Sequence, residues 1–325
     1  MLNTIDLFVG CGGLSEGFEQ SRKYKMIGAV EWEPSPVKEL RNHLKNRWGI
    51  QDSEERVLQF DIQRTEELFN GWKDKKFGES KGLDALVGNR QLDVIIGGPP
   101  CQAYSVAGRI RDEHGMREDY RNYLFESYLK VVQHYKPRVF VFENVPGILS
   151  AKPGDGSVRI IDLIQKAFAD AGYAVLPDLS NAIIDMTEYG VPQNRKRIII
   201  LGVSKEHYGD KAEAMVEKFY SSYLPEYKIE KKATVRDAIG DLPKLRPLDE
   251  PISYLGRKLS HSVSDPLING HISRFHNKRD IELFKFLEED IASGRLKYTS
   301  AKSLKTLYTK LTGKTSNVHK YYVLR

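Results

Sequence analysis

The chain has 325 residues, of which 40% are hydrophobic, and its 50 Lys and Arg against 44 Asp and Glu give a formal net charge of +6 at pH 7. This composition is sufficient for a sizeable core in one large domain or two, and no apolar run approaches the ~18 residues of a membrane span. With only two cysteines, and no charged region or long apolar run at its start, the chain is expected to lack disulfides and a secretion signal and to be cytoplasmic.

The first 204 residues alternate between strand-like and helix-like segments. The predicted strands are Thr4–Val9, Met26–Val30, Val57–Phe60, Leu92–Ile96, Val139–Phe142 and Arg197–Val203. The predicted helices are Leu14–Ser21, Ser35–Asn46, Tyr123–His134 and Ser157–Ala171. Because the strands are short and apolar without polar alternation, both faces of their sheet should be covered. The pattern predicts an α/β fold with a doubly wound, mostly parallel sheet.

The composition changes near Glu206, which predicts a second region. Helical patterns continue at Lys211–Tyr220, Thr234–Leu242 and Phe275–Ile291. Residues 244–270 are rich in proline, serine and glycine and are predicted to form loops. From Ala292 onward there is little apolar periodicity, and this tail is not expected to bury much surface by itself. We therefore predict one domain over residues 1–204 and a separate region over residues 205–325.

The charge is unevenly distributed along the chain. Residues 1–204 hold 27 Lys and Arg against 28 Asp and Glu, whereas residues 205–325 hold 23 against 16. Eight basic residues, four tyrosines and no acidic residue follow Asp290. Such a mixture suits a polyanion, because Lys and Arg displace the counterions of phosphates. A solvated basic tail explains the same feature equally well.

A glycine loop follows the first predicted strand, in the run Asp6-Leu7-Phe8-Val9-Gly10-Cys11-Gly12-Gly13. Glycines let a backbone turn tightly and approach a ligand, and a helix that begins there offers free N–H groups. Glu31 and Trp32 follow the second strand, where an acid can accept hydrogen bonds from a ribose and an indole can stack on a flat ring. Asp61 follows the third strand and can accept from an exocyclic amine. Each acid alone is more simply a helix cap or a surface charge, but the three features together predict a nucleoside-cofactor site.

The fourth predicted strand leads into the run Gly98-Pro99-Pro100-Cys101-Gln102. Ligands of open α/β folds bind at the carboxyl ends of strands, and Cys101 should lie at that edge. The two prolines restrict the backbone before the cysteine, so its sulfur should have a fixed direction. Cys101 is therefore predicted to be a nucleophile.

Glu143 and two arginines form a further candidate group. Glu143 follows the strand Val139–Phe142, and a partly buried carboxyl group there is suited to carry a proton near neutral pH. An ordinary cap before Pro146 is the alternative. Arg195 and Arg197 stand at the start of the last predicted strand. We expect their side chains on opposite faces of it, one beside Glu143 and the other toward a ligand, with solvated surface arginines as the alternative.

These motifs, in this order, resemble those of the cytosine-C5 DNA methyltransferase family. The matching runs are Asp6-Leu7-Phe8-x-Gly10-x-Gly12-Gly13, Pro99-Pro100-Cys101-Gln102, Glu143-Asn144-Val145 and Gln193-x-Arg195-x-Arg197. The run Asp119–Phe125 is also similar, and the likeness covers roughly residues 3–204, with weaker similarity over Thr234–Pro243. The resemblance implies a Rossmann-like catalytic domain that binds S-adenosylmethionine in residues 1–204. Residues 205–325 are then a partial region for target recognition, DNA contact or partner docking.

The resemblance also implies a mechanism. The Cys101 thiolate adds to C6 of a cytosine flipped out of double-stranded DNA, and C5 then takes the methyl group of S-adenosylmethionine. Glu143 acts at N3 of the base, while Arg197, supported by Arg195, binds the base oxygen or holds the carboxylate. The implied DNA contacts are Gln102 and Ser105. The implied cofactor pocket contains Phe8, Gly10, Gly12, Leu14, Glu31, Trp32, Asp61, Ile62 and Pro100.

The chain departs from the family pattern toward its end. The run Gly313-Lys314-Thr315-Ser316-Asn317-Val318 is not accepted as the family's Gly-Asn-x-Val motif, because no helical pattern follows it, and most of a recognition segment is missing. We expect either one subunit of a split enzyme, whose small partner carries the missing segments, or a truncated, inactive chain.

The leading hypothesis is a restriction–modification enzyme acting at the nucleoid of a bacterial or archaeal cell. The alternatives are a tRNA cytosine methyltransferase, a non-catalytic DNA-binding subunit and a dinucleotide-dependent dehydrogenase. The dehydrogenase hypothesis explains the glycine loop and Glu31, but it leaves Cys101, Glu143 and the two arginines without roles.

Overall fold

The computed structural model describes residues 1–100, 124–152, 157–268 and 270–316. Its contacts divide the chain into two compact units, Met1–Asp237 and Ala238–Arg325, and each unit is described by itself. The predicted boundary lies earlier, between residues 204 and 205. The segment after residue 204 joins the first unit because a helix over Lys211–Lys218 buries Ala212 and Val216 in that unit's core.

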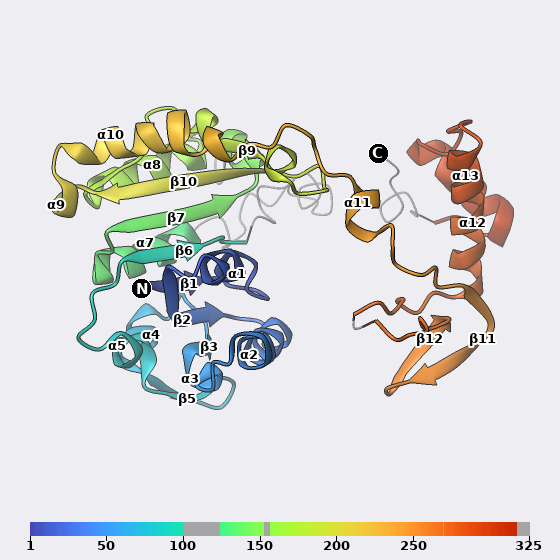
Figure 1. Cartoon of the computed structure of the whole chain (residues 1–325), viewed down its shortest axis with the longest axis horizontal. Coiled ribbons are helices and arrows are strands. Elements are labelled where there is room, and N and C mark those ends of the chain that lie inside the picture. Colours follow the sequence, from blue (N-terminus) through green and yellow to red (C-terminus); the bar gives the residue numbers. More distant parts are fainter. Residues whose placement is uncertain (101–123, 153–156, 269, 317–325) are drawn as a thin grey trace. The chain divides into compact units, whose positions relative to one another are not determined.

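The first unit is built on an eight-stranded sheet (Figure 1). Its strands are β1 (Leu2–Leu7), β2 (Tyr24–Glu31), β3 (Val57–Gln59), β6 (Val94–Gly97), β7 (Val139–Asn144), β8 (Tyr173–Ala174), β9 (Ile183–Asp185) and β10 (Lys196–Ser204). The strand order is β3-β2-β1-β6-β7-β10-β8, and β9 also pairs with β10. All neighbours from β3 to β7 are parallel, and β10 pairs antiparallel with β7, β8 and β9. The predicted α/β fold with a mostly parallel sheet is confirmed.

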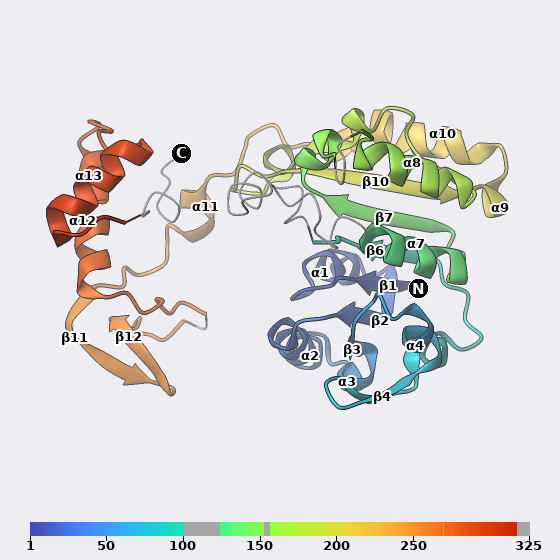
Figure 2. The same cartoon turned by 180° about the vertical axis from the view of Figure 1, so that it is seen from behind.

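Helices cover both faces of this sheet (Figure 2). Among the described residues, the α-helices of the first unit are α1 (Gly13–Gln20), α2 (Pro34–Trp48), α3 (Ser53–Arg56), α4 (Thr65–Asn70), α5 (Gly82–Val87), α7 (Leu124–Tyr135), α8 (Ile160–Asp170), α9 (Lys205–Tyr208) and α10 (Lys211–Lys218), and α11 (Val235–Ile239) crosses the boundary. On one face α2 buries Leu40 and Leu44 in a cluster with Ala29 of β2. The next residue of β2, Val30, belongs to a larger cluster with α4, α5, α7 and α8. Adjacent strand residues point to opposite faces, so the two clusters cover the two faces of the sheet.

The parallel pairing brings the carboxyl ends of four strands to one edge. Leu7 of β1 is in register with both Val30 of β2 and Gly97 of β6, and Glu31 of β2 is in register with Gln59 of β3. The loops that follow these strands therefore start side by side. This edge is where open α/β sheets bind their ligands.

Gly202 in β10 lies against the ring of Phe140 in β7, its partner in register. A Cβ atom at Gly202 would come within 2.0 Å of that ring. Phe140 is fully buried against Phe168 and Tyr173, so the ring has little room to move. We expect Gly202→Ala to lower the free energy of unfolding by about 1–3 kcal/mol, the usual cost of overpacking a core. Urea unfolding measures the effect. Gly17→Ala, at an open position in α1, is the control and should not destabilise the protein.

The second unit contains a hairpin, β11 (Pro247–Tyr254) and β12 (Arg257–His261), and two helices, α12 (Lys278–Ala292) and α13 (Ala301–Thr312). The prediction of loops throughout residues 244–270 is wrong. Prolines at positions 247 and 251 argued against a strand, yet proline is tolerated in an edge strand. Leu255 and Gly256 form the turn of the hairpin with positive φ angles.

The prediction that the tail after Ala292 has little apolar periodicity is also wrong, although this tail buries its residues against α12 and not by itself. Helix α13 buries Leu304, Leu307 and Tyr308 against Leu283 and Leu287 of α12, in a cluster separate from the main core. These three residues are spaced by three and then one position, so they form a narrow apolar stripe along the helix. The lysines and threonines on its other faces make the apolar pattern hard to recognise in the sequence. Ser300 and Ser303 form a capping box at the start of α13, and Gly313 ends it.

Candidate active site

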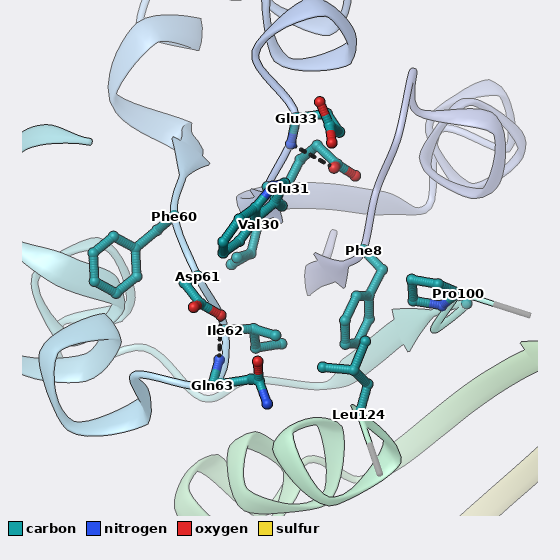
Figure 3. Close-up of a pocket in the computed structure, with 12 residues that line it drawn as sticks. Phe8, Val30, Glu31, Glu33, Phe60, Asp61, Ile62, Gln63, Pro100 and Leu124 are labelled. Atoms are coloured by element: carbon teal, nitrogen blue, oxygen red, sulfur yellow. Dashed lines mark hydrogen bonds between the residues drawn. The ribbon is translucent and has the colours of Figure 1, made fainter. Parts of the chain in front are cut away.

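A cavity of about 270 Å³ lies at the carboxyl ends of β1, β2, β3 and β6 (Figure 3). The predicted cofactor residues among those that line it are Phe8, Glu31, Trp32, Asp61, Ile62 and Pro100. The lining residues that sequence analysis missed are Val30, Glu33, Phe60, Gln63, Gly98 and Leu124. All but Leu124 are close neighbours of a predicted residue, so widening each strand-end motif by one or two positions finds them. Leu124 comes from α7, and no sequence signal placed it here.

Glu31 joins the glycine loop to the end of β2. Its Oε2 accepts a hydrogen bond of 2.8 Å from the Gly10 N–H, and its Oε1 accepts one of 2.9 Å from the Glu33 N–H. The positive φ angle of Gly10, 57°, favours glycine at that position. Gly10, Gly12 and Leu14 are not among the lining residues of the cavity; Gly10 is connected to it through Glu31.

Asp61 and two aromatic rings define the side of the cavity formed by β2 and β3. Asp61 Oδ1 accepts a 3.0 Å hydrogen bond from the Gln63 N–H, which holds the carboxylate at the start of its loop (Figure 3). Phe60 is buried and stacks on Trp72 with ring centroids 3.9 Å apart. Trp32 remains 42% exposed at the cavity. This wall combines a hydrogen-bond acceptor with flat apolar surfaces, which suits a nucleoside.

Glu143, at the end of β7, is paired with both predicted arginines. Arg197 Nε lies 2.7 Å from Glu143 Oε1, and Arg195 Nη2 lies 3.8 Å from the same oxygen. The expectation that the arginines project to opposite faces is wrong, because residues two positions apart in a strand share a face. The side chains of Glu143 and Arg197 are only 21% and 19% exposed, whereas Arg195 is 44% exposed. Arg197 is therefore the closer and more protected partner.

The Glu143 carboxylate lies against the loop that leads to Cys101. A Cβ atom at Gly98 would come within 2.6 Å of Glu143 Oε2, so only glycine permits this approach. The buried Asn144 donates a 3.2 Å hydrogen bond from Nδ2 to the Pro99 carbonyl. These two contacts join β7 to the start of the cysteine loop. Cys101, Gln102 and Ser105 themselves lie outside the described residues.

Asp6 is a buried acid beneath the glycine loop. Sequence analysis did not predict its burial. It is 1% exposed, and the hydroxyl of Ser15 in α1 donates a hydrogen bond to its Oδ2. Its Oδ1 has no hydrogen-bond partner among the described residues. Burial raises the pKa of Asp6 to about 7, an effect that the Ser15 hydrogen bonds partly offset. Asp6 and Ser15 thus connect the two sides of the glycine loop, the end of β1 and the start of α1.

A doubly wound sheet with a glycine loop and acids at adjacent strand ends defines the class of α/β domains that bind nucleoside cofactors. Within that class, the chain belongs to the C-5 cytosine-specific DNA methylase family, whose family model matches residues 2–286. The predicted resemblance is therefore confirmed.

Similar proteins include several named Type II methyltransferases. M.Bpa9945I of Bacillus paralicheniformis is 32% identical over 90% of this chain and 76% of its own length. M.AgeI of Thalassovita gelatinovora is 33% identical over 78% of this chain but 54% of its own length. The chain thus spans three quarters of one relative and about half of the other.

A solved structure with a similar fold is described as a DNA modification methyltransferase encoded within a prophage of E. coli. It has a TM-score of 0.52 and 23% identity, and the match covers 89% of this chain and 69% of that one. This likeness supports the fold alone. No helix in the described ranges has the length and hydropathy required to cross a membrane.

Proposed function

We propose that this chain methylates C5 of a cytosine flipped out of double-stranded DNA, with S-adenosylmethionine as the methyl donor and within a restriction–modification system. The observation that supports it most strongly is the Glu143–Arg197 pair, which lies against the loop that leads to Cys101, beside a cavity suited to a nucleoside. Family membership supplies the reaction type.

The residues of the cavity fit the cofactor. Glu31, already oriented by two backbone N–H groups, is placed to accept from ribose hydroxyls, and Asp61 from the adenine amine. Phe8 and Trp32 offer apolar rings to the purine. When bound, S-adenosylmethionine supplies an electrophilic methyl group. The glycine loop is joined to this site by the hydrogen bond from the Gly10 N–H to Glu31.

The chain's own side chains perform the remaining steps on the base. The Cys101 thiolate forms a bond to C6, and the displaced electron pair of the C5–C6 bond makes C5 nucleophilic. Glu143 hydrogen-bonds or protonates N3, which favours this addition, and the two arginines hold the carboxylate in place. After C5 has gained the methyl group, a base removes the C5 proton and Cys101 leaves with its electron pair. The active-site cysteine is regenerated.

The proposed partners of the chain are double-stranded DNA and a small second subunit. Gln102 and Ser105 are assigned to DNA contacts, and the basic residues after Asp290 to phosphates. The second subunit with a Gly-Asn-x-Val segment stays a prediction. Adding such a chain to the assay below tests it directly, because its presence should raise the yield of the trapped adduct.

The proposal is tested by trapping with a random-sequence DNA duplex that contains 5-fluorocytosine. With S-adenosylmethionine present, C5 of the analogue gains the methyl group, but its fluorine cannot then leave as a proton does. The Cys101–C6 adduct should therefore persist and shift the protein on a denaturing gel. The adduct should form with the wild-type chain and with Cys11→Ser, the matched control, and be absent with Cys101→Ser. An adduct that survives in Cys101→Ser contradicts the mechanism. Trapping only on 5-fluorocytosine RNA favours the tRNA alternative.

A further inference from the structure

A small hairpin outside the main sheet lies beside the cavity. Its strands are β4 (Trp72–Asp74) and β5 (Gly78–Ser80), and sequence analysis predicted neither. Asp74 organises its turn, because Oδ1 accepts hydrogen bonds from the Lys76 N–H at 2.7 Å and the Phe77 N–H at 3.1 Å. The other oxygen of Asp74 accepts a 2.7 Å hydrogen bond from Arg64, which also pairs with Glu67 of α4. The turn is thus held by contacts within the protein.

The tip of this hairpin contacts the outer side of the cavity wall. Lys76 Nζ lies 3.9 Å from the centroid of the Trp32 ring, a cation–π distance. The Phe77 ring meets Trp32 edge-on at 5.6 Å and Phe60 at 5.2 Å. Trp32 and Phe60 both line the cavity, whereas Lys76 and Phe77 do not. The hairpin therefore forms a second layer behind the two aromatic rings.

We propose that Lys76 and Phe77 are positioning residues that hold the Trp32 indole in place for the purine nucleoside portion of the cofactor. This inference rests on the proposed function. An indole that is 42% exposed and unsupported would lose rotamer freedom when a ligand binds, and that loss weakens affinity. A cation over one face also leaves only the other face and the edges of the indole available to the purine. The hairpin therefore contributes to affinity without touching the cofactor.

The test measures cofactor affinity by calorimetry with S-adenosylhomocysteine, and KM and kcat with S-adenosylmethionine. We expect Lys76→Ala to raise both the Kd and the KM by about 2- to 5-fold, the range for an exposed cation–π contact. The kcat at saturating cofactor should stay within about twofold of wild type, because affinity alone is affected. Lys76→Arg should restore the wild-type Kd, since a guanidinium also binds an aromatic face. Lys75→Ala, the adjacent exposed lysine, is the matched control and should leave the Kd unchanged.

The outcomes separate this inference from the proposed function. If the wild-type chain binds neither S-adenosylhomocysteine nor S-adenosylmethionine, the proposed function fails. If the wild type binds and Lys76→Ala binds equally well, the inference about the hairpin is overturned and the proposed function stands. Equal weakening in Lys75→Ala and Lys76→Ala also overturns it, because it shows an effect of net charge. A thermal unfolding midpoint common to all three variants confirms that the fold is retained.

Discussion

Replacing Glu143 with glutamine is expected to lower the kcat for methyl transfer by about 10²–10⁴-fold, the range for losing a general acid or base. Glutamine keeps the size of the side chain and its contact with Gly98, but it carries no exchangeable acid proton and no negative charge for Arg197. Because Glu143 does not line the cavity, the Kd for S-adenosylhomocysteine should be unchanged. Initial rates with a tritiated methyl donor on duplex DNA measure the effect.

The two arginines provide a graded control for this prediction. Arg197→Lys keeps a positive charge but loses the planar guanidinium that contacts Glu143 at 2.7 Å, so a substantial loss of kcat is expected. Arg195→Lys changes a contact of 3.8 Å at a more exposed side chain, and its effect should be smaller. A Glu143→Gln variant whose kcat stays within tenfold of wild type would show that the pair is structural. Equal losses in both arginine variants would contradict the ranking.

The second large effect concerns stability, and it involves Asp6. Burial raises the folded-state pKa of this carboxyl to about 7, well above its unfolded value. Between these two values the folded protein binds a proton that the unfolded chain does not bind, so the free energy of unfolding falls as the pH rises through this window. Asp6→Asn removes the titration and remains neutral. From pH 5 to pH 8 the stability of Asp6→Asn relative to wild type should therefore increase by about 3 kcal/mol, at 1.36 kcal/mol per pKa unit.

Urea unfolding of both proteins at several pH values between 5 and 8 measures this difference, in which the other titrating groups largely cancel. Ser15→Ala gives a second measurement. The Ser15 hydroxyl stabilises the charged carboxylate, and its removal should raise the pKa of Asp6 further, so that the loss of stability continues to higher pH and becomes larger. A stability difference between Asp6→Asn and wild type that does not change with pH contradicts the assignment of a buried, neutral Asp6.

Most of the first unit could be predicted from its strands. The predicted segment Met26–Val30 lies within β2, and Val139–Phe142 lies within β7. Strand-end residues such as Glu31 and Asp61 came together as expected, because parallel strands place their carboxyl ends at one edge. In the first unit, the local pattern of apolar residues and the pairing of the strands therefore lead to the same site. The second unit was harder, because its hairpin contains prolines and its helices bury only a narrow stripe of residues.

The sequence by itself determined the α/β class and the order of the motifs, and its pattern of residues at strand ends predicted Glu31, Trp32 and Asp61, which line the cavity. The resemblance to the family added Phe8, Ile62 and Pro100, which line it too. Only the tertiary structure decided that both arginines meet one oxygen of Glu143, that Asp6 is buried beneath the glycine loop, and that Lys76 reaches the ring of Trp32. Each of these contacts joins residues from different strands, helices or hairpins. Such contacts depend on strand order, register and packing, which no local pattern of residues specifies.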